Sequence, residues 1–344
     1  MSVHPVSVSN AAKTYRAERR QALLRRIAHN RMLTIGGSVL LAVVLLSLLG
    51  PLLTPYGPLQ IDPVSRLRGP SAAHWFGTDN FGRDVMTRVV YGARISLLVG
   101  AAVTLIASLV GLAVGLLSAY YSILDHILMR ICDGLFAFPS LLLAIAIMAA
   151  MGPKPSNVVI ALSIISVPSI ARIIRSRALV IREQTYIEAL RAQGAGAGRI
   201  LWLHMAPNTL SPLIVQSTFI FAASILTEAS LSFLGAGIPA PSPSLGNMLY
   251  DGKTVIYNAW WMTVFPGAFI LLIVLGLNLF GDGLRDLLDP HAKRRKKVAF
   301  GGLGWSRRKL RESGGKNETD PQSDTAFSND PTKGGATDGG KATS

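Results

Sequence analysis

Two segments of this chain come close to the glycine-rich pattern that binds nucleotide phosphates, G-x-x-x-x-G-K-[ST]. Residues 246–254 end in Gly-Lys-Thr but place five residues between the two glycines instead of four. Residues 335–342 have the correct spacing but end in alanine, which cannot supply the hydroxyl that binds magnesium. Neither segment is expected to hold a nucleotide.

Catalysis of hydrolysis inside a membrane would need a serine nucleophile beside a histidine base. The chain has six histidines, and those nearest its long apolar stretches, His126 and His204, lie at the edges of these stretches. The single cysteine, Cys132, excludes an internal disulfide and a cysteine-based metal cluster. We therefore predict no catalytic residue and no metal site, and an enzymatic role for the chain is disfavoured.

Two acidic residues, Glu228 and Asp133, lie at the ends of apolar stretches. A charge within the bilayer is costly, so an ionisable residue there is a functional candidate by default. Each could lie on a substrate path or form a structural pair, which for Glu228 could be an arginine of a neighbouring chain. A structural pair is favoured for both.

The elements that would position such residues are membrane spans. Half of the residues are hydrophobic and 15% are charged, with a mean hydropathy of +0.40, which is a membrane composition. A helix needs about 20 apolar residues to cross the bilayer. We predict an all-α membrane protein with about six spans, the fourth of which contains Pro168: residues 33–53, 95–121, 133–152, 156–172, 209–228 and 260–281.

The net charge of +15 raises the alternative of nucleic-acid binding. However, an N-terminus inside the cell places 20 Lys and Arg in cytoplasmic segments against 7 outside, as the positive-inside rule requires. Both termini are therefore predicted to be cytoplasmic, with no nucleic-acid partner. Arginines of the first external connection oppose the rule, but aspartates accompany them: Arg66, Arg68, Arg83 and Arg88 with Asp62, Asp79 and Asp84.

Outside the spans, residues 1–32 form a basic cytoplasmic arm. Leu23, Leu24 and Ile27 share a helical face there, which favours a helix lying in the membrane interface over a disordered arm. Residues 291–344 begin as a basic stretch and then have too few apolar residues to fold, so we predict a disordered tail.

The two external connections differ from the spans in composition. Residues 54–93 are rich in proline and glycine in their first half, and residues 80–94 predict a short helix against the membrane. Residues 231–259 predict a constrained loop. Within the second span, Gly111 and Gly115 follow Ala107 at G-x-x-x-G spacing; this either lets a neighbouring helix approach closely or reflects the ordinary frequency of small residues in membrane helices.

The cytoplasmic connection 183–207 is too polar to span and predicts a helix, a glycine turn and a second helix. Apolar residues recur along it, and such residues on a water-exposed loop imply a partner protein. They are Tyr186, Ile187, Leu190, Ile200, Leu201 and Leu203.

The same loop resembles the EAA loop of ATP-binding-cassette importer permeases. Glu188 and Ala189 match its start, Gly194 follows six residues after the glutamate, and Pro207 follows thirteen residues after the glycine. Two positions depart from the family pattern. Leu190 replaces the usual second alanine, and His204-Met205-Ala206 stands where the family has a hydrophobic pair before the proline. The spacing of the motif is unchanged.

Four further segments are similar to the C-type permease of dipeptide, oligopeptide and nickel importers. Together with the loop, the resemblance covers roughly residues 20–291. The segments read HWFGTDNFGRDVMTRVVYGARISL, LSFLGAGIPAPSPSLGNML, WWMTVFPG and NLFGDGLRDLLDP.

This resemblance implies a type I importer permease fold over residues 33–290, in a bacterial inner membrane. It implies a homologous second permease, two ATPase subunits that use ATP and magnesium, and an external solute-binding protein, with no cofactor bound by this chain. The loop would be the coupling helix that inserts into an ATPase, whose closure drives alternating access.

Two alternatives remain beside import of small peptides. The same machinery could import nickel or another small solute. A secondary transporter or channel is the other, although such carriers often contain internal repeats, and no duplicated half is visible here.

Overall fold

The computed structural model describes residues 28 and 30–288. The chain divides into two compact units, Met1–Pro290 and His291–Ser344, and all described residues lie in the first. The interfacial helix expected around Leu23 and the tail expected from residue 291 onward fall outside the described residues.

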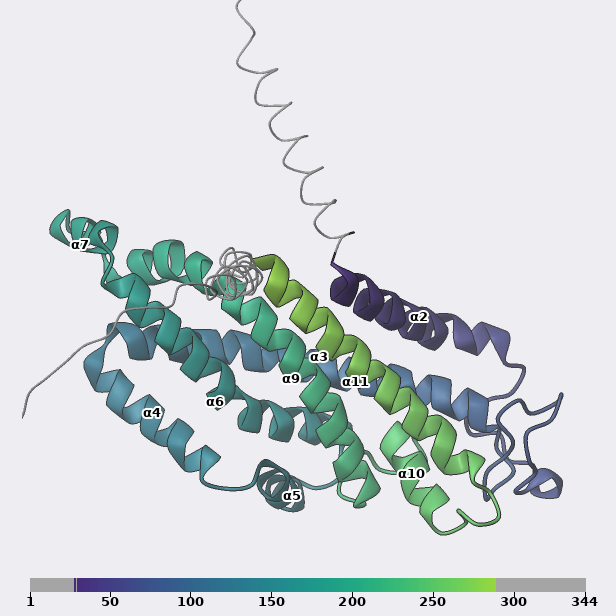
Figure 1. Ribbon diagram of the computed structural model, residues 1–344. Helices are drawn as coiled ribbons and strands as arrows, with labels where there is room; N and C mark the ends of the chain where they lie inside the picture. The colour runs from purple at the N-terminus through teal and green to yellow at the C-terminus, as the bar shows by residue number, and fades with distance from the viewer. Residues whose placement is uncertain (1–27, 29, 289–344) are drawn as a thin grey trace, which may run out of the picture. The chain divides into compact units, whose positions relative to one another are not determined.

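Helices make up most of the described structure, and no β-strand occurs among residues 30–288 (Figure 1). Leu33 and Asn30 show how one begins, because the Asn30 side chain accepts the Leu33 N–H at the start of the first described helix. In chain order the helices are α2 (Arg31–Leu53), the 3₁₀ turn η1 (Pro63–Ser65), α3 (Val85–Tyr120), α4 (Ser122–Phe136), α5 (Ser140–Met151), α6 (Pro155–Arg182), α7 (Thr185–Ala192), α8 (Ala197–Arg199), the π-helix η2 (Ile200–Met205), α9 (Ala206–Phe233), α10 (Leu245–Lys253) and α11 (Trp261–Leu288).

Within the described residues, five helices are long and apolar enough to cross a membrane, or six if α4 and α5 together form one bent span. The first expected span, 33–53, agrees with α2. The fourth, fifth and sixth correspond to α6, α9 and α11, which run beyond the expected limits. A limit set at the first charged residue ends too early, because a helix continues past the bilayer edge into water.

The third expected span, 133–152, is not one continuous helix in the structure. Helix α4 ends at Phe136, α5 begins at Ser140, and their axes differ by 95°. Pro139, the residue before α5, has no N–H to donate, and its ring disfavours helical geometry at Phe138. The start at residue 133 was also wrong, because α4 begins eleven residues earlier and contains Asp125.

The second expected span and the short helix expected at residues 80–94 are one element. Helix α3 runs unbroken for 36 residues, from Val85 to Tyr120. Asp84 ends the loop before it, accepting the Thr87 N–H and hydroxyl, each at 2.8 Å. The arginine that interrupts its apolar outer end, Arg88, is neutralised by Asp79.

Helix α3 lies at the centre of the bundle, against α6 and α9 (Figure 1). A Cβ atom on Gly111 would lie 2.7 Å from Ile170, and one on Gly115 would lie 2.7 Å from the carbonyl oxygen of Ala171. The small residues at G-x-x-x-G spacing therefore serve a close approach, and the neighbouring helix is α6. On the other side, α2 packs along α11.

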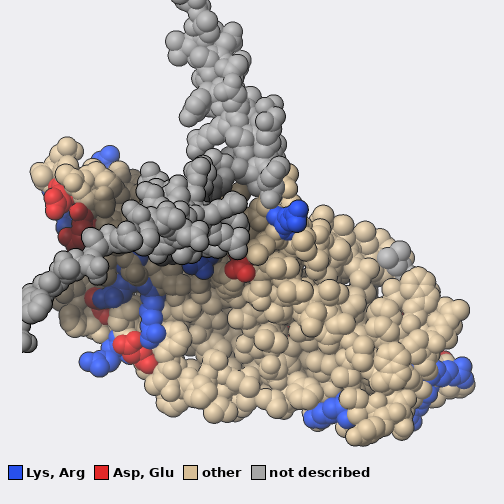
Figure 2. Space-filling model, viewed as in Figure 1, with Lys and Arg blue, Asp and Glu red and all other residues tan. Residues whose placement is uncertain are grey.

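The start of α2 lies beside the end of α11, because the Asn30 side chain donates to the Gly283 carbonyl oxygen at 2.9 Å. The first and last described helices therefore meet at one end of the bundle, which agrees with termini on the same side. Charged side chains gather toward the ends of the visible face, with a broad uncharged surface between them (Figure 2). The loop expected at residues 231–259 contains the helix α10.

Candidate functional site

The connection 183–207 forms the predicted helix, glycine turn and helix. Helix α7 ends in two reversed hydrogen bonds: the Gly194 N–H donates to the Arg191 carbonyl at 2.9 Å, and the Ala195 N–H donates to the Leu190 carbonyl at 3.0 Å. This is the Schellman arrangement, which needs a left-handed residue after the cap. Gly194 supplies it with φ of +79°. The glycine thus fixes the angle at which the chain leaves α7.

Beyond the turn the chain continues through Pro207 without a break. A continuous apolar helix extends from Ala197 to Phe233, and Pro207 lies in the first turn of α9. Just before it, residues 200–205 adopt π-helical bonding, in which the Ala206 N–H reaches back to the Leu201 carbonyl. Proline lacks an N–H, so the regular ladder cannot continue through it and the preceding turn rearranges.

Most apolar residues of the loop pack inside this chain, which corrects the expectation that they form a partner surface. Ile187 and Ile200 are fully buried, Leu201 is 4% exposed, and Leu190 is partly buried in the same cluster. The loop folds back against the inner ends of α3 and α6, and this contact uses those side chains.

The surface left for a partner is smaller and more mixed than expected. Glu188, Ala189, Gly194 and Pro207 are all exposed. Glu188 lies in the first turn of α7, where its charge favours the positive end of the helix dipole. The large exposed apolar side chains of the loop are Tyr186, Trp202 and Leu203.

Asp133 pairs with Arg172 of α6, its oxygen 2.8 Å from the guanidinium. Both side chains are about half exposed, so the pair contributes little to stability. The Arg172 guanidinium also lies over the Phe136 ring, 4.1 Å from its centre. Asp133 therefore joins α4 to α6, as the favoured structural reading describes.

A stronger pair nearby was missed by sequence reasoning. Arg175 of α6 holds Asp125 of α4 with two parallel hydrogen bonds, Nε to Oδ1 at 2.5 Å and Nη2 to Oδ2 at 2.6 Å. Arg172, Arg175 and Arg182 are three and seven residues apart, so they share one face of α6. That spacing was the signal that could have found them.

Glu228 is fully buried between α9, α3 and the loop before α10. Ser96 and Ser232 donate hydroxyl hydrogen bonds to its two oxygens, each at 2.8 Å. Its partners among the described residues are serines, not an arginine, and its side chain reaches no surface of this chain. Glu228 therefore lies at a junction of helices.

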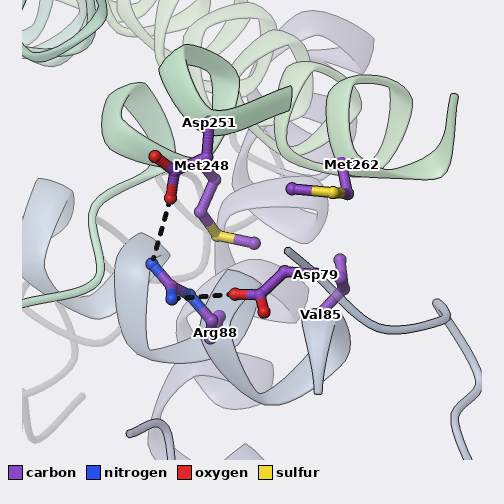
Figure 3. Close-up of a pocket in the computed structure, with 6 residues that line it drawn as sticks. All are labelled: Asp79, Val85, Arg88, Met248, Asp251 and Met262. Atoms are coloured by element: carbon purple, nitrogen blue, oxygen red, sulfur yellow. Dashed lines mark hydrogen bonds and ion pairs between the residues drawn. The ribbon is translucent and has the colours of Figure 1, made fainter. Parts of the chain in front are cut away.

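Two of the four arginines in the first connection, Arg83 and Arg88, form ion pairs. Asp79 Oδ2 accepts from Arg83 Nε at 2.6 Å and from Arg88 Nη1 at 2.9 Å, and all three side chains are buried. Asp251 of α10 faces the Arg83 guanidinium at 3.7 Å and the Arg88 guanidinium at 3.9 Å, and Figure 3 shows the contact with Arg88. The charges of Arg83 and Arg88, two of the arginines that oppose the predicted topology, are thus neutralised locally.

A small pocket opens beside these charges, lined by Asp79, Val85, Arg88, Met248, Asp251 and Met262 (Figure 3). The Arg88 Nε has no hydrogen-bond partner among the described residues. Burial raises the pKa of Asp251, while Arg83 opposes this rise and Asp79 adds to it. The cluster ties the loop before α3 to α10.

Comparison with known proteins places these features in a wider group. A dipeptide transport system permease protein of Alkalihalophilus pseudofirmus is 46% identical over 270 residues, covering 78% of this chain and 89% of that protein. A probable D,D-dipeptide transport system permease protein of Escherichia coli is 42% identical over 262 residues, covering 76% and 88%. A glutathione transport system permease protein of Pectobacterium atrosepticum is 42% identical, covering 78% and 90%.

Among solved structures, the chain resembles the MetNI methionine ABC transporter in an inward-facing conformation. The match has a TM-score of 0.50 and 22% identity, and it covers 59% of this chain and 97% of that chain. At this identity the likeness concerns the fold, which is that of an ABC importer permease.

Family profiles cover most of the described residues. The N-terminal transmembrane domain of oligopeptide transport permease C matches residues 19–70. The binding-protein-dependent transport system inner membrane component matches residues 79–294, which include the loop, the buried Glu228 and the external charge cluster. With the relatives above, these matches show that the chain belongs to the family of binding-protein-dependent transport system inner membrane components.

Proposed function

We propose that the chain is one permease subunit of an ATP-driven importer that carries small peptides across a bacterial inner membrane. The observation that carries the proposal is the loop: a short helix, α7, locked at a fixed angle by Gly194 and presenting Glu188 and Tyr186 to water. The relatives named for dipeptide transport support the solute class.

The chemistry of energy conversion lies outside this chain. Two ATPase subunits bind ATP and magnesium, and α7 inserts into a groove on one of them. A homologous second permease completes the pathway, and an external binding protein delivers the peptide. Movement of α7 when the ATPases close then reorients the helices between inward and outward access.

The test is uptake by the complete complex in proteoliposomes, with ATP inside and binding protein outside. Glu188→Lys reverses the charge on the exposed face of α7, so we expect ATP-dependent uptake of labelled dipeptide to be abolished while membrane insertion is unchanged. Asp286→Lys is the matched control, because Asp286 is an exposed acid at the end of α11, outside the loop.

Normal uptake by the Glu188→Lys complex would contradict the role of α7. Uptake of nickel but not of dipeptides would support the proposed ATP-driven importer and contradict the proposed solute. Uptake by this chain alone, without ATPases, would favour a secondary transporter.

A further inference from the structure

The end of α6 is bonded to the end of α3. Arg182 Nη1 donates to the backbone carbonyl of Ala119 at 2.8 Å. Ala119 lies in the last turn of α3, whose carbonyl groups have no partner inside the helix and form the negative end of its dipole. A guanidinium there caps the helix. Arg182 is therefore the C-terminal cap of α3, supplied three residues before α7 begins.

The far end of α7 contacts the same place. The Arg191 guanidinium carbon lies 5.2 Å from the centre of the Tyr120 ring, which is within cation–π range. Tyr120 is the last residue of α3, and Arg191 lies in the last turn of α7. One contact is therefore made by a residue just before α7, and the other by a residue in its last turn.

Between the two contacts, α7 buries an apolar side chain. Ile187 is fully buried and belongs to the same core cluster as Ala119 and Ile181. Tilting α7 away from α3 would separate Arg191 from Tyr120 and expose Ile187 to water. The Arg182 cap meanwhile holds the end of α6, from which α7 continues, against α3. Each loss opposes the motion, so α7 and the inner end of α3 behave as one body.

We propose that Arg182 and the Tyr120–Arg191 contact clamp the coupling loop to α3, so that a displacement of α7 moves α3 directly as well as α9. The proposal rests on the proposed function, because it names the helix that receives the motion. Helix α3 has 36 residues, about 54 Å at 1.5 Å per residue, and its outer end carries Arg88 of the external charge cluster. Arg182, Tyr120 and Arg191 are positioning residues, since none has to touch solute or nucleotide.

The first test compares Arg182→Met and Arg182→Lys with Arg177→Met in the reconstituted complex. Arg177 is an exposed arginine two residues from Arg175, so it lies on the opposite side of α6, and it makes no ion pair among the described residues. We expect Arg182→Met to retain bound ATPases but to transport at least about threefold less peptide per ATP hydrolysed. Arg182→Lys should recover part of the ratio, because an ammonium also donates to a carbonyl. Arg177→Met should match the unmodified complex.

An unchanged ratio in Arg182→Met, or an equal loss in Arg177→Met, would overturn the clamp. A merely structural role for Arg182 would lower the thermal midpoint and yield of the complex without changing peptide transported per ATP. Failure of the unmodified chain to bind ATPases would instead remove the proposed function, so the two failures are distinguishable.

The second test replaces the contact with a covalent one, and it stands even if Arg182→Met does not fold. Tyr120→Cys and Arg191→Cys are combined in a Cys132→Ala background, which removes the single native thiol. The double variant should transport less peptide per ATP hydrolysed. A bifunctional maleimide that joins positions 120 and 191 should restore this ratio. Full cross-linking with no recovery of uptake would show that α7 must move relative to α3, which is the opposite of the proposal.

Discussion

Gly194 is needed for its backbone angle and not for space. No atom lies within 4 Å of the position that a Cβ would take, but φ is +79°. A residue with a side chain pays about 1–2 kcal/mol for the left-handed conformation. The spacing between Glu188 and Gly194 therefore has a local cause. Glu188 lies in the first turn of α7, and Gly194 is the residue at which the chain leaves this short helix.

We predict a graded loss of uptake at this position. Gly194→Ala should reduce ATP-dependent uptake and helix order in the loop, and Gly194→Pro should abolish uptake because it also removes the N–H that bonds to Arg191. Gly198→Ala is the control, since Gly198 is open to space and its φ is not positive. Normal solute-stimulated ATPase activity in the Gly194→Pro complex would contradict this assignment.

Asp251 is an acidic residue outside the spans whose surroundings oppose its charge. Burial raises its pKa above the ordinary 3.8 despite the nearby Arg83. A carboxyl with a raised pKa in the folded state binds its proton more tightly there than when unfolded. Its effect is therefore most favourable to folding below pH 3.8, and stability falls as pH rises through the raised pKa.

Asp251→Asn, which mimics the protonated side chain, should thus raise the thermal midpoint of the detergent-solubilised protein near pH 7. The gain should shrink toward pH 4, where the native carboxyl is increasingly protonated. Thermal unfolding at both pH values measures it, with the exposed Asp286→Asn as control. A lower midpoint at pH 7 would show that pairing with Arg83 and Arg88 outweighs burial.

At the scale of elements, α6 holds the inner half of the bundle through one row of arginines. Arg172 and Arg175 bind the two acidic residues of α4, and Arg182 caps α3. The pairs differ in burial: Asp133 is 62% exposed, whereas Asp125 is 22% exposed and bound by two parallel hydrogen bonds. Bidentate pairs shielded from water are the stronger kind.

We therefore expect Arg175→Met to destabilise the protein by about 1 kcal/mol after allowance for solvent screening, and Arg172→Met to have a smaller effect. Thermal unfolding in detergent at low and high salt measures both. The Arg172 variant should respond less to salt than the unmodified protein, because the exposed pair that salt screens is gone. Equal destabilisation by both variants would contradict the ranking by burial.

At the scale of the whole molecule, the topology depends on α4 and α5. Asp125 of α4 contacts the inner half of α6, whereas Met148 of α5 packs with Val99 in the outer half of α3 and with Val158 near the start of α6. The two short helices together therefore lead from one end of the bundle to the other. Counted as one bent span, they give six crossings.

Cysteine labelling in intact cells tests this count. In the Cys132→Ala background, Lys154→Cys should react with a membrane-impermeant maleimide from outside, because Lys154 is exposed just before α6 begins. Arg177→Cys, exposed near the other end of α6, should react only after the membrane is opened. Protection of position 154 would instead make α4 and α5 a re-entrant loop.

The sequence by itself determined that the chain has about six apolar spans and a polar loop with a helix that ends at Gly194, because these follow from local properties: runs of apolar residues and a fixed spacing between Glu188 and Gly194. The orientation, which rests on the distribution of Lys and Arg, stays a prediction. Hydropathy needs no knowledge of neighbours. The G-x-x-x-G spacing in α3 left two explanations open, and only the structure showed that it serves a close approach, with α6 as the neighbouring helix.

Only the tertiary structure decided which side chains are buried or paired within the chain and are therefore not available to a partner. Ile187 and Ile200 looked like a partner surface, yet the loop folds back and buries both. The second span was expected to begin at residue 95, yet the helix begins ten residues earlier, at Val85, and includes Arg88, which pairs with Asp79. For Glu228 a pairing with an arginine was one alternative, yet its hydrogen-bond donors within this chain are Ser96 of α3 and Ser232 of α9. In each case, whether a charge is paired or an apolar side chain is buried depends on residues elsewhere in the chain. A local sequence pattern does not show which residues these are.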